Sequence, residues 1–145
     1  MEMVGILFSL LTGILVSLQV VFNNRVSDKI GLWETTVIVH AVGLIFGIIL
    51  MAVFGDGNLG KIGEVKKLYL IGGMFGVIIV YSSMVGIILL GAAFSTSVML
   101  IAQLIVATAI DAFGLFGASR IEFDFTKLLG VLIMIIGIIV FKLRG

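Results

Sequence analysis

Residues 32–54 read LWETTVIVHAVGLIFGIILMAVF, an almost wholly apolar segment without lysine, arginine or proline. An α-helix needs about 20 such residues to cross the hydrocarbon core of a bilayer, which is about 30 Å thick. Similar segments occur at about residues 3–24, 68–90, 92–113 and 127–143. The sequence therefore predicts an all-α membrane protein with five transmembrane helices.

The composition leaves no room for a soluble domain. Hydrophobic residues make up 61% of the chain and charged residues 12%. Soluble domains are about 45–50% apolar and about 25% charged. We therefore predict a single integral membrane domain over residues 1–145, surrounded by the lipid bilayer.

Several function classes are excluded by what the sequence lacks. The chain has no cysteine, which excludes disulfides and thiolate chemistry. Its net charge is +1 and no basic run is interleaved with aromatic residues, so nucleic-acid binding is not expected. The G-x-G-x-x-G at residues 55–60 follows a membrane helix instead of a strand, which argues against a dinucleotide site. We expect no cofactor, no metal and, without a nucleophile–base arrangement, no enzyme.

Positive charges are nearly balanced between the two sides of the membrane. Five lie on one side and four on the other: Lys61, Lys66, Lys67, Arg120 and Lys127, against Arg25, Lys29, Lys142 and Arg144. A membrane protein normally fixes its orientation by a clear Lys/Arg excess on the cytoplasmic side, so we predict that this chain inserts both ways up. Two oppositely inserted copies would form an antiparallel homodimer of ten helices, an inverted repeat like that of many transporters. The alternatives are a parallel dimer and a subunit oriented by a partner.

Two amides near the end of the first apolar segment are candidate substrate ligands. Gln19 and Asn23 are one helical turn apart on one face, so both could meet one ligand or the same neighbouring helix. Polar groups in hydrocarbon are costly unless they are paired. The alternative is interhelical hydrogen bonding, worth about 0.6–2 kcal/mol for each contact in membranes.

The second apolar segment holds the only histidine, His40, and an acid at its start, Glu34. Histidine titrates close to neutral pH, which suits proton coupling; the alternative for His40 is a neutral hydrogen-bonding group. Glu34 is either an interfacial carboxylate in contact with water or a proton- or cation-binding acid at the mouth of a cavity.

The fourth apolar segment carries Gln103 near its middle and Asp111 near its end. An ionisable residue inside the membrane is a functional-site candidate. The macrodipole disfavours an anion at the C-terminal end of a helix, so Asp111 needs a compensating cation, a proton or a cationic substrate. The structural alternative is a partner such as Arg120 or Arg25.

Five short motifs, in order along the chain, resemble those of the YdcZ-like proteins, small five-span members of the drug/metabolite transporter superfamily. They are QVVFN at residues 19–23, HAVG at 40–43, GGMFG at 72–76, AQL at 102–104 and IDAFGLFG at 110–117. Together they cover nearly the whole chain, and their order and spacing are more specific than any one of them.

The resemblance implies a multi-pass exporter of the inner membrane that works as an antiparallel pair, or as a fused or paired-gene version of one. The chain is also similar in size to the small multidrug resistance exporters, which have four spans and an acidic residue inside the first helix. Here the only acid in that region is Glu2, at its extreme end. If protons are exchanged, Asp111, Glu34 or His40 must take over that role.

We therefore expect a secondary transporter that exports a small polar or cationic metabolite or drug by alternating access at the dimer interface. Gln19, Asn23 and Gln103 would line the substrate cavity, together with His40. Asp111 or Glu34 would supply charge or proton coupling. The alternatives are a dual-topology passive ion channel and a non-transporting membrane subunit.

Overall fold

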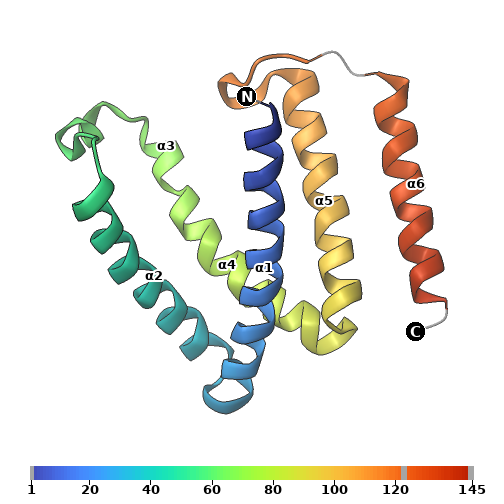
Figure 1. The fold of residues 1–145 in the computed structure, drawn as a ribbon, viewed down its shortest axis with the longest axis horizontal. Coiled ribbons are helices and arrows are strands. Elements are labelled where there is room, and N and C mark those ends of the chain that lie inside the picture. Colours follow the sequence, from blue (N-terminus) through green and yellow to red (C-terminus); the bar gives the residue numbers. More distant parts are fainter. Residues whose placement is uncertain (1, 122–123, 144–145) are drawn as a thin grey trace. The chain divides into compact units, whose positions relative to one another are not determined.

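A computed structural model describes residues 2–121 and 124–143 of the chain (Figure 1). Its long helices are α1 (Glu2–Ile30), α2 (Leu32–Phe54), α4 (Gly72–Leu90), α5 (Ala92–Phe113) and α6 (Phe125–Lys142). Three short helices join them: η1 (Leu59–Glu64), α3 (Lys67–Leu70) and η2 (Leu115–Gly117). The described residues contain no strand, and the prediction of an all-α chain with five long apolar helices is confirmed.

The first helix is longer than predicted. Its expected end near residue 24 is wrong, because α1 continues to Ile30. The polar residues of this last part are compatible with a helix: the Ser27 hydroxyl donates to the Asn24 carbonyl at 2.8 Å, and Arg25 lies 3.9 Å from Asp28 one turn away. Lys29 lies in the last turn, where the helix dipole favours a cation.

The third span is interrupted near its start, where we expect one continuous helix over residues 68–90. α3 ends at Leu70 and α4 begins at Gly72. The Met74 amide bonds the Ile71 carbonyl at 2.8 Å, a tight turn between the two helices. Gly72 and Gly73 follow, and glycine is a poor helix former. The interruption therefore lies where helix propensity is weakest.

Single glycines make the two shortest connections. Gly31 joins α1 to α2 with φ 96° and ψ 163°, and Gly91 joins α4 to α5 with φ 78° and ψ 160°. Only glycine adopts this region of backbone space readily. Each glycine carbonyl then accepts a hydrogen bond from the amide four residues on, at Thr35 and Ser95, both at 3.1 Å.

The chain divides into two compact units, residues 1–89 and 90–145. The prediction of a single membrane domain stays a prediction. In the first unit, α1 and α2 lie closest where Gly31 joins them and diverge from there (Figure 1). α4 contacts α2 through the rings of Tyr81 and Trp33, which stack with centroids 4.2 Å apart.

In the second unit, α5 packs against α6 (Figure 1). Asp124 caps α6, since its carboxylate accepts hydrogen bonds from the Thr126 amide and hydroxyl. At the other end of this helix pair the Lys142 ammonium lies 4.3 Å from the centre of the Phe94 ring. This cation–π contact and the cap hold the two ends of α6.

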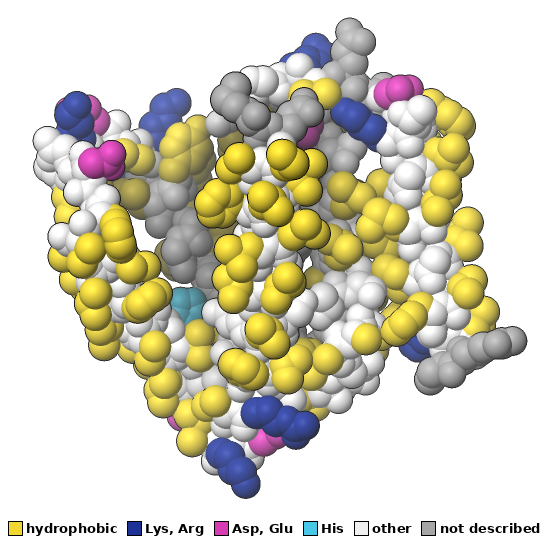
Figure 2. All heavy atoms as spheres, in the orientation of Figure 1, with side chains coloured by type: hydrophobic (Ala, Val, Ile, Leu, Met, Phe, Trp, Pro, Cys, Tyr) yellow, Lys and Arg dark blue, Asp and Glu magenta, His cyan; other side chains and the backbone are white. Residues whose placement is uncertain are grey.

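The side chains are distributed as a bilayer requires. Figure 2 shows hydrophobic side chains along the helices and charged ones at helix ends. The few buried residues of α1, α2 and α4 are largely polar: Val20, Asn23, Ser27, Thr35, Thr36, Ser83, Met84 and Ile87. The buried part of the first unit therefore consists mainly of small polar side chains and is not a large apolar core.

Candidate functional site

The candidate site occupies the halves of α1 and α2 that adjoin Gly31. It combines two amides, three hydroxyls and an imidazole, which we call the polar cluster: Asn23, Asn24, Ser27, Thr35, Thr36 and His40. Gly31 turns the chain so that the start of α2 lies beside the end of α1, and the two helices diverge further along.

The three hydroxyl groups of the polar cluster are satisfied within their own helices. Ser27 donates to the Asn24 carbonyl, Thr35 to the Gly31 carbonyl at 2.7 Å, and Thr36 to the Leu32 carbonyl at 2.8 Å. Thr35 and Thr36 are almost fully buried, at 0% and 1% exposure. These groups therefore act as buried helix-packing residues.

The two amides are not satisfied. Asn23 is 5% exposed, and its side chain makes no hydrogen bond to any described residue. Oδ1 of Asn24 is buried, and it too lacks a partner in the described part of the chain. Leaving a buried polar group unpaired costs about 1–3 kcal/mol. The polar cluster therefore offers buried hydrogen-bonding capacity that the chain itself leaves unused.

His40 presents one ring nitrogen to its own helix and the other to α4. Nδ1 lies 2.7 Å from the Thr36 carbonyl. A carbonyl oxygen only accepts, so Nδ1 carries the hydrogen, and in the neutral ring Nε2 keeps its lone pair. A Cβ built on Gly76 would come within 3.1 Å of Nε2, so this nitrogen faces the backbone of α4.

Glu34 lies at the edge of the polar cluster, in the first turn of α2. Its carboxylate folds back over Gly31, where a Cβ would collide with Oε2. The N-terminal end of a helix favours an anion. The neighbouring Trp33 is held by its stacking on Tyr81. Glu34 and the stacked ring of Trp33 therefore lie side by side in the sequence at the start of α2.

The other predicted site residues lie elsewhere. Gln19 is exposed on α1, outside the polar cluster, and Gln103 is exposed on α5. Neither side chain bonds any described residue. Asp111 is half-buried near the end of α5, and its carboxylate forms no ion pair within residues 2–121 and 124–143. Arg120 instead donates from Nε to the Ala112 carbonyl at 3.2 Å.

Two features of the site were not predicted as functional. Asn24 supplies the buried unpaired oxygen, and Gly76 supplies the surface against which His40 lies. The signal for Asn24 was its position beside Asn23, but the expected helix end near residue 24 placed it at the very end of the span. Nothing local to Gly76 indicates which side chain contacts it.

The chain has the spans of a multi-pass membrane protein. Among the described residues, five helices are long and apolar enough to cross a membrane: Met3–Ile30, Leu32–Phe54, Lys67–Leu90, Ala92–Phe113 and Phe125–Lys142. No group of three or more acidic or histidine side chains in the described part of the chain could hold a metal ion.

Comparison with known proteins identifies the family. Neither the curated proteins nor the solved structures contain a match to this chain. The family described as "Putative inner membrane exporter, YdcZ" matches residues 4–140, which confirms the resemblance seen in the sequence motifs. An exporter of this kind is a transporter and not an enzyme. With its five spans and this match over almost its whole length, the chain belongs to the YdcZ family of multi-pass inner-membrane exporters.

Proposed function

We propose that the chain is a secondary transporter that exports a small polar or cationic molecule, with the polar cluster as part of its substrate site. The observation that carries this proposal is the buried and unpaired Oδ1 of Asn24, next to the largely buried Asn23, whose side chain bonds no described residue. In a membrane span such groups call for a polar ligand or a partner helix.

The chemistry of the polar cluster favours a substrate that donates hydrogen bonds. Oδ1 of Asn24 is an acceptor, and so is Nε2 of a neutral His40. An ammonium, amine or hydroxyl group supplies the matching donors. Glu34 adds a negative charge at the end of the span, where it would attract a cation before it enters. If protons are exchanged for the substrate, the imidazole of His40 is one group that we propose for this role.

A second copy of the chain completes the proposed transporter. Gln19 and Gln103 are exposed amides within spans, and hydrocarbon cannot satisfy them. The near-balance of Lys and Arg in the sequence, five against four, supports insertion in both orientations. We therefore infer an antiparallel homodimer in which these amides meet partner helices or water.

A flux assay tests the transport proposal. The full chain in proteoliposomes should move radiolabelled ethanolamine, putrescine or methylammonium when a pH gradient is imposed, and should not move the anion benzoate. Asn23→Ala should reduce the flux by at least about tenfold, because one hydrogen bond to a charged group is worth about 1.5–3 kcal/mol. Ser17→Ala is the matched control on α1, since that hydroxyl only bonds the Gly13 carbonyl of its own helix. Absence of flux for all three cations would contradict the proposal.

The same preparation separates the alternatives. A passive channel would carry an ion current in planar bilayers that does not saturate and needs no gradient of protons. A non-transporting subunit would give neither flux nor current and would co-purify with another protein.

Labelling of single cysteines tests the dimer, because the natural chain has none. Gly57→Cys places a thiol in the exposed segment after α2, where a Cβ meets nothing within 4 Å. With dual insertion, an impermeant maleimide should label this thiol from both sides of the membrane. Ile45→Cys, in the middle of α2, should resist the reagent from either side. Labelling of Gly57→Cys from one side only would contradict the antiparallel homodimer.

A further inference from the structure

We propose that the cavity between α5 and α6 binds an anionic phospholipid, with its phosphate held by Arg120 and Lys127. This cavity has a volume of about 970 Å³ and lies wholly within the second unit. It is separate from the polar cluster, and the proposal does not depend on the transported substrate.

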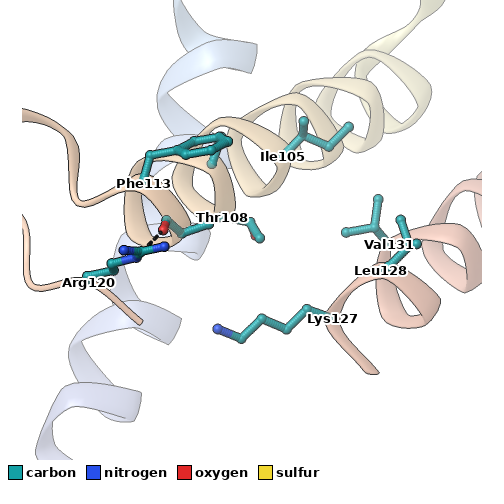
Figure 3. Close-up of a pocket in the computed structure, with 9 residues that line it drawn as sticks. Ile105, Thr108, Phe113, Arg120, Lys127, Leu128 and Val131 are labelled. Carbon is teal, nitrogen blue, oxygen red and sulfur yellow. Dashed lines mark hydrogen bonds between the residues drawn. The ribbon is translucent and has the colours of Figure 1, made fainter. Parts of the chain in front are cut away.

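The charged end of the cavity is formed by two elements. Arg120 precedes α6, and its Nε donates to the Ala112 carbonyl at the end of α5, which holds the guanidinium at the cavity edge. Its Nη1 and Nη2 atoms bond no described residue. Lys127 comes from the first turn of α6, and Figure 3 shows its side chain extending into the space between the two helices. Two cations beside one cavity favour an anion.

The nearby acids within the described residues, Asp111 and Asp124, leave this preference in place. Asp124 is close enough for the charge of Lys127 to act on it, but its carboxylate is turned to Thr126 and does not line the cavity. Asp111 does not line it either. Lys127 already interacts with its surroundings, and a headgroup adds to these interactions, because an ammonium has three donors. Arg120 is the main contact, since its fork matches a phosphate in shape and charge.

Apart from Thr108, the other side chains that line the cavity are apolar, which selects a lipid over a free anion. Ile105 and Phe113 line it from α5, and Leu128 and Val131 from α6 (Figure 3). From Ile105 to Ala112 the lining extends about 10 Å along the helix. The cations lie where α5 ends and α6 begins, at the level of the headgroups, and the apolar walls run inward from there. Basic pockets between transmembrane helices are known sites for anionic headgroups.

Native mass spectrometry of the full chain in detergent tests this site. The protein is mixed with equal amounts of phosphatidylglycerol and phosphatidylcholine, and the ratio of the two bound lipids is measured. We expect phosphatidylglycerol to be preferred. Arg120→Gln should lower this preference about fivefold, the effect of one cation near the membrane surface, whereas Arg120→Lys should retain most of it. Lys66→Gln is the control, because it removes the same charge from a residue that does not line the cavity.

Four outcomes overturn the proposal. The first is an unchanged lipid ratio in Arg120→Gln, and the second is no preference in the natural chain. The third is displacement of the lipid by excess inorganic phosphate, which would make this a site for a free anion. Val131→Trp, which fills the apolar end and leaves both cations in place, is a second variant. It should also remove the preference, and a preference that survives this change contradicts a site for the acyl chain.

Discussion

The imidazole of His40 on α2 lies against Gly76 on α4, so close that a Cβ at Gly76 would come within 3.1 Å of Nε2. His40 cannot easily withdraw, because its other nitrogen is bonded to the Thr36 carbonyl at 2.7 Å. Only the absence of a side chain at residue 76 allows this approach. The contact brings a titratable group of one span to the backbone of another.

Gly76→Ala should therefore destabilise the first unit. Overpacking of this kind costs about 1–3 kcal/mol, partly offset by the helix propensity of alanine, worth about 1 kcal/mol. Gly73→Ala is the control, because its Cβ would meet nothing within 4 Å and it lies in the same helix. Thermal unfolding in detergent should place Gly76→Ala below Gly73→Ala. Equal stability of the two variants would show that His40 does not press on this glycine.

The stacking of Trp33 on Tyr81 should be measurable by fluorescence, because Trp33 is the only tryptophan. The ring centroids are 4.2 Å apart with an angle of 23° between the planes. Such a pair is worth about 0.5–1.5 kcal/mol beyond the area it buries. Tyr81→Leu should lower stability by about that amount and shift the emission of Trp33, while Tyr81→Phe should do neither. An unchanged spectrum in Tyr81→Leu would argue against the stack.

Replacing either linking glycine should strain the backbone. Positive φ with an extended ψ costs a residue other than glycine about 1–3 kcal/mol. Gly31→Ala adds a collision with the Glu34 carboxylate, whereas a Cβ on Gly91 meets nothing within 4 Å. We expect both variants to unfold at lower temperature, Gly31→Ala more so, and the double variant Gly31→Ala/Glu34→Ala to recover the difference. Failure of that recovery would refute the proposed collision.

Asn23→Ala should separate function from stability. A structural amide loses its hydrogen bonds when it is truncated, which costs about 0.5–1.5 kcal/mol for each bond. The Asn23 amide bonds no described residue, so its removal should leave the unfolding temperature nearly unchanged while transport falls. A large loss of stability in this variant, with flux lost in parallel, would instead indicate a packing role.

The start of α6 should loosen in acid. The carboxylate of Asp124 accepts hydrogen bonds from the hydroxyl and the amide of Thr126, with the positive charge of Lys127 nearby, and these interactions lower its pKa below the ordinary value of 3.8. Because the pKa of Asp124 is lower in the folded state than in the unfolded state, the cap stabilises α6 fully at pH values above the ordinary pKa. This stabilisation is lost as the pH falls through the pKa of the folded state. Hydrogen exchange in the first turn of α6 should accelerate below about pH 4. In Asp124→Asn, hydrogen exchange of the same amides should show little pH dependence beyond that of the intrinsic exchange rate.

The sequence alone determined the number and type of the spans. The length of an apolar segment is a local property, and it can be compared directly with the thickness of the bilayer core. The sequence also determined the bounds of α2 and α5, each of which follows a glycine, Gly31 or Gly91, that ends the preceding helix. The prediction from the sequence was wrong at residues 25–30, where polar side chains suggested a loop, and at Ile71, where the helix break depends on a glycine pair.

Only the tertiary structure decided that His40 faces Gly76, that the Asn24 oxygen is buried, and that Arg120 and Lys127 border one cavity. These relationships depend on which faces of separate helices meet, and nearly uniform apolar helices carry little periodic signal to specify that.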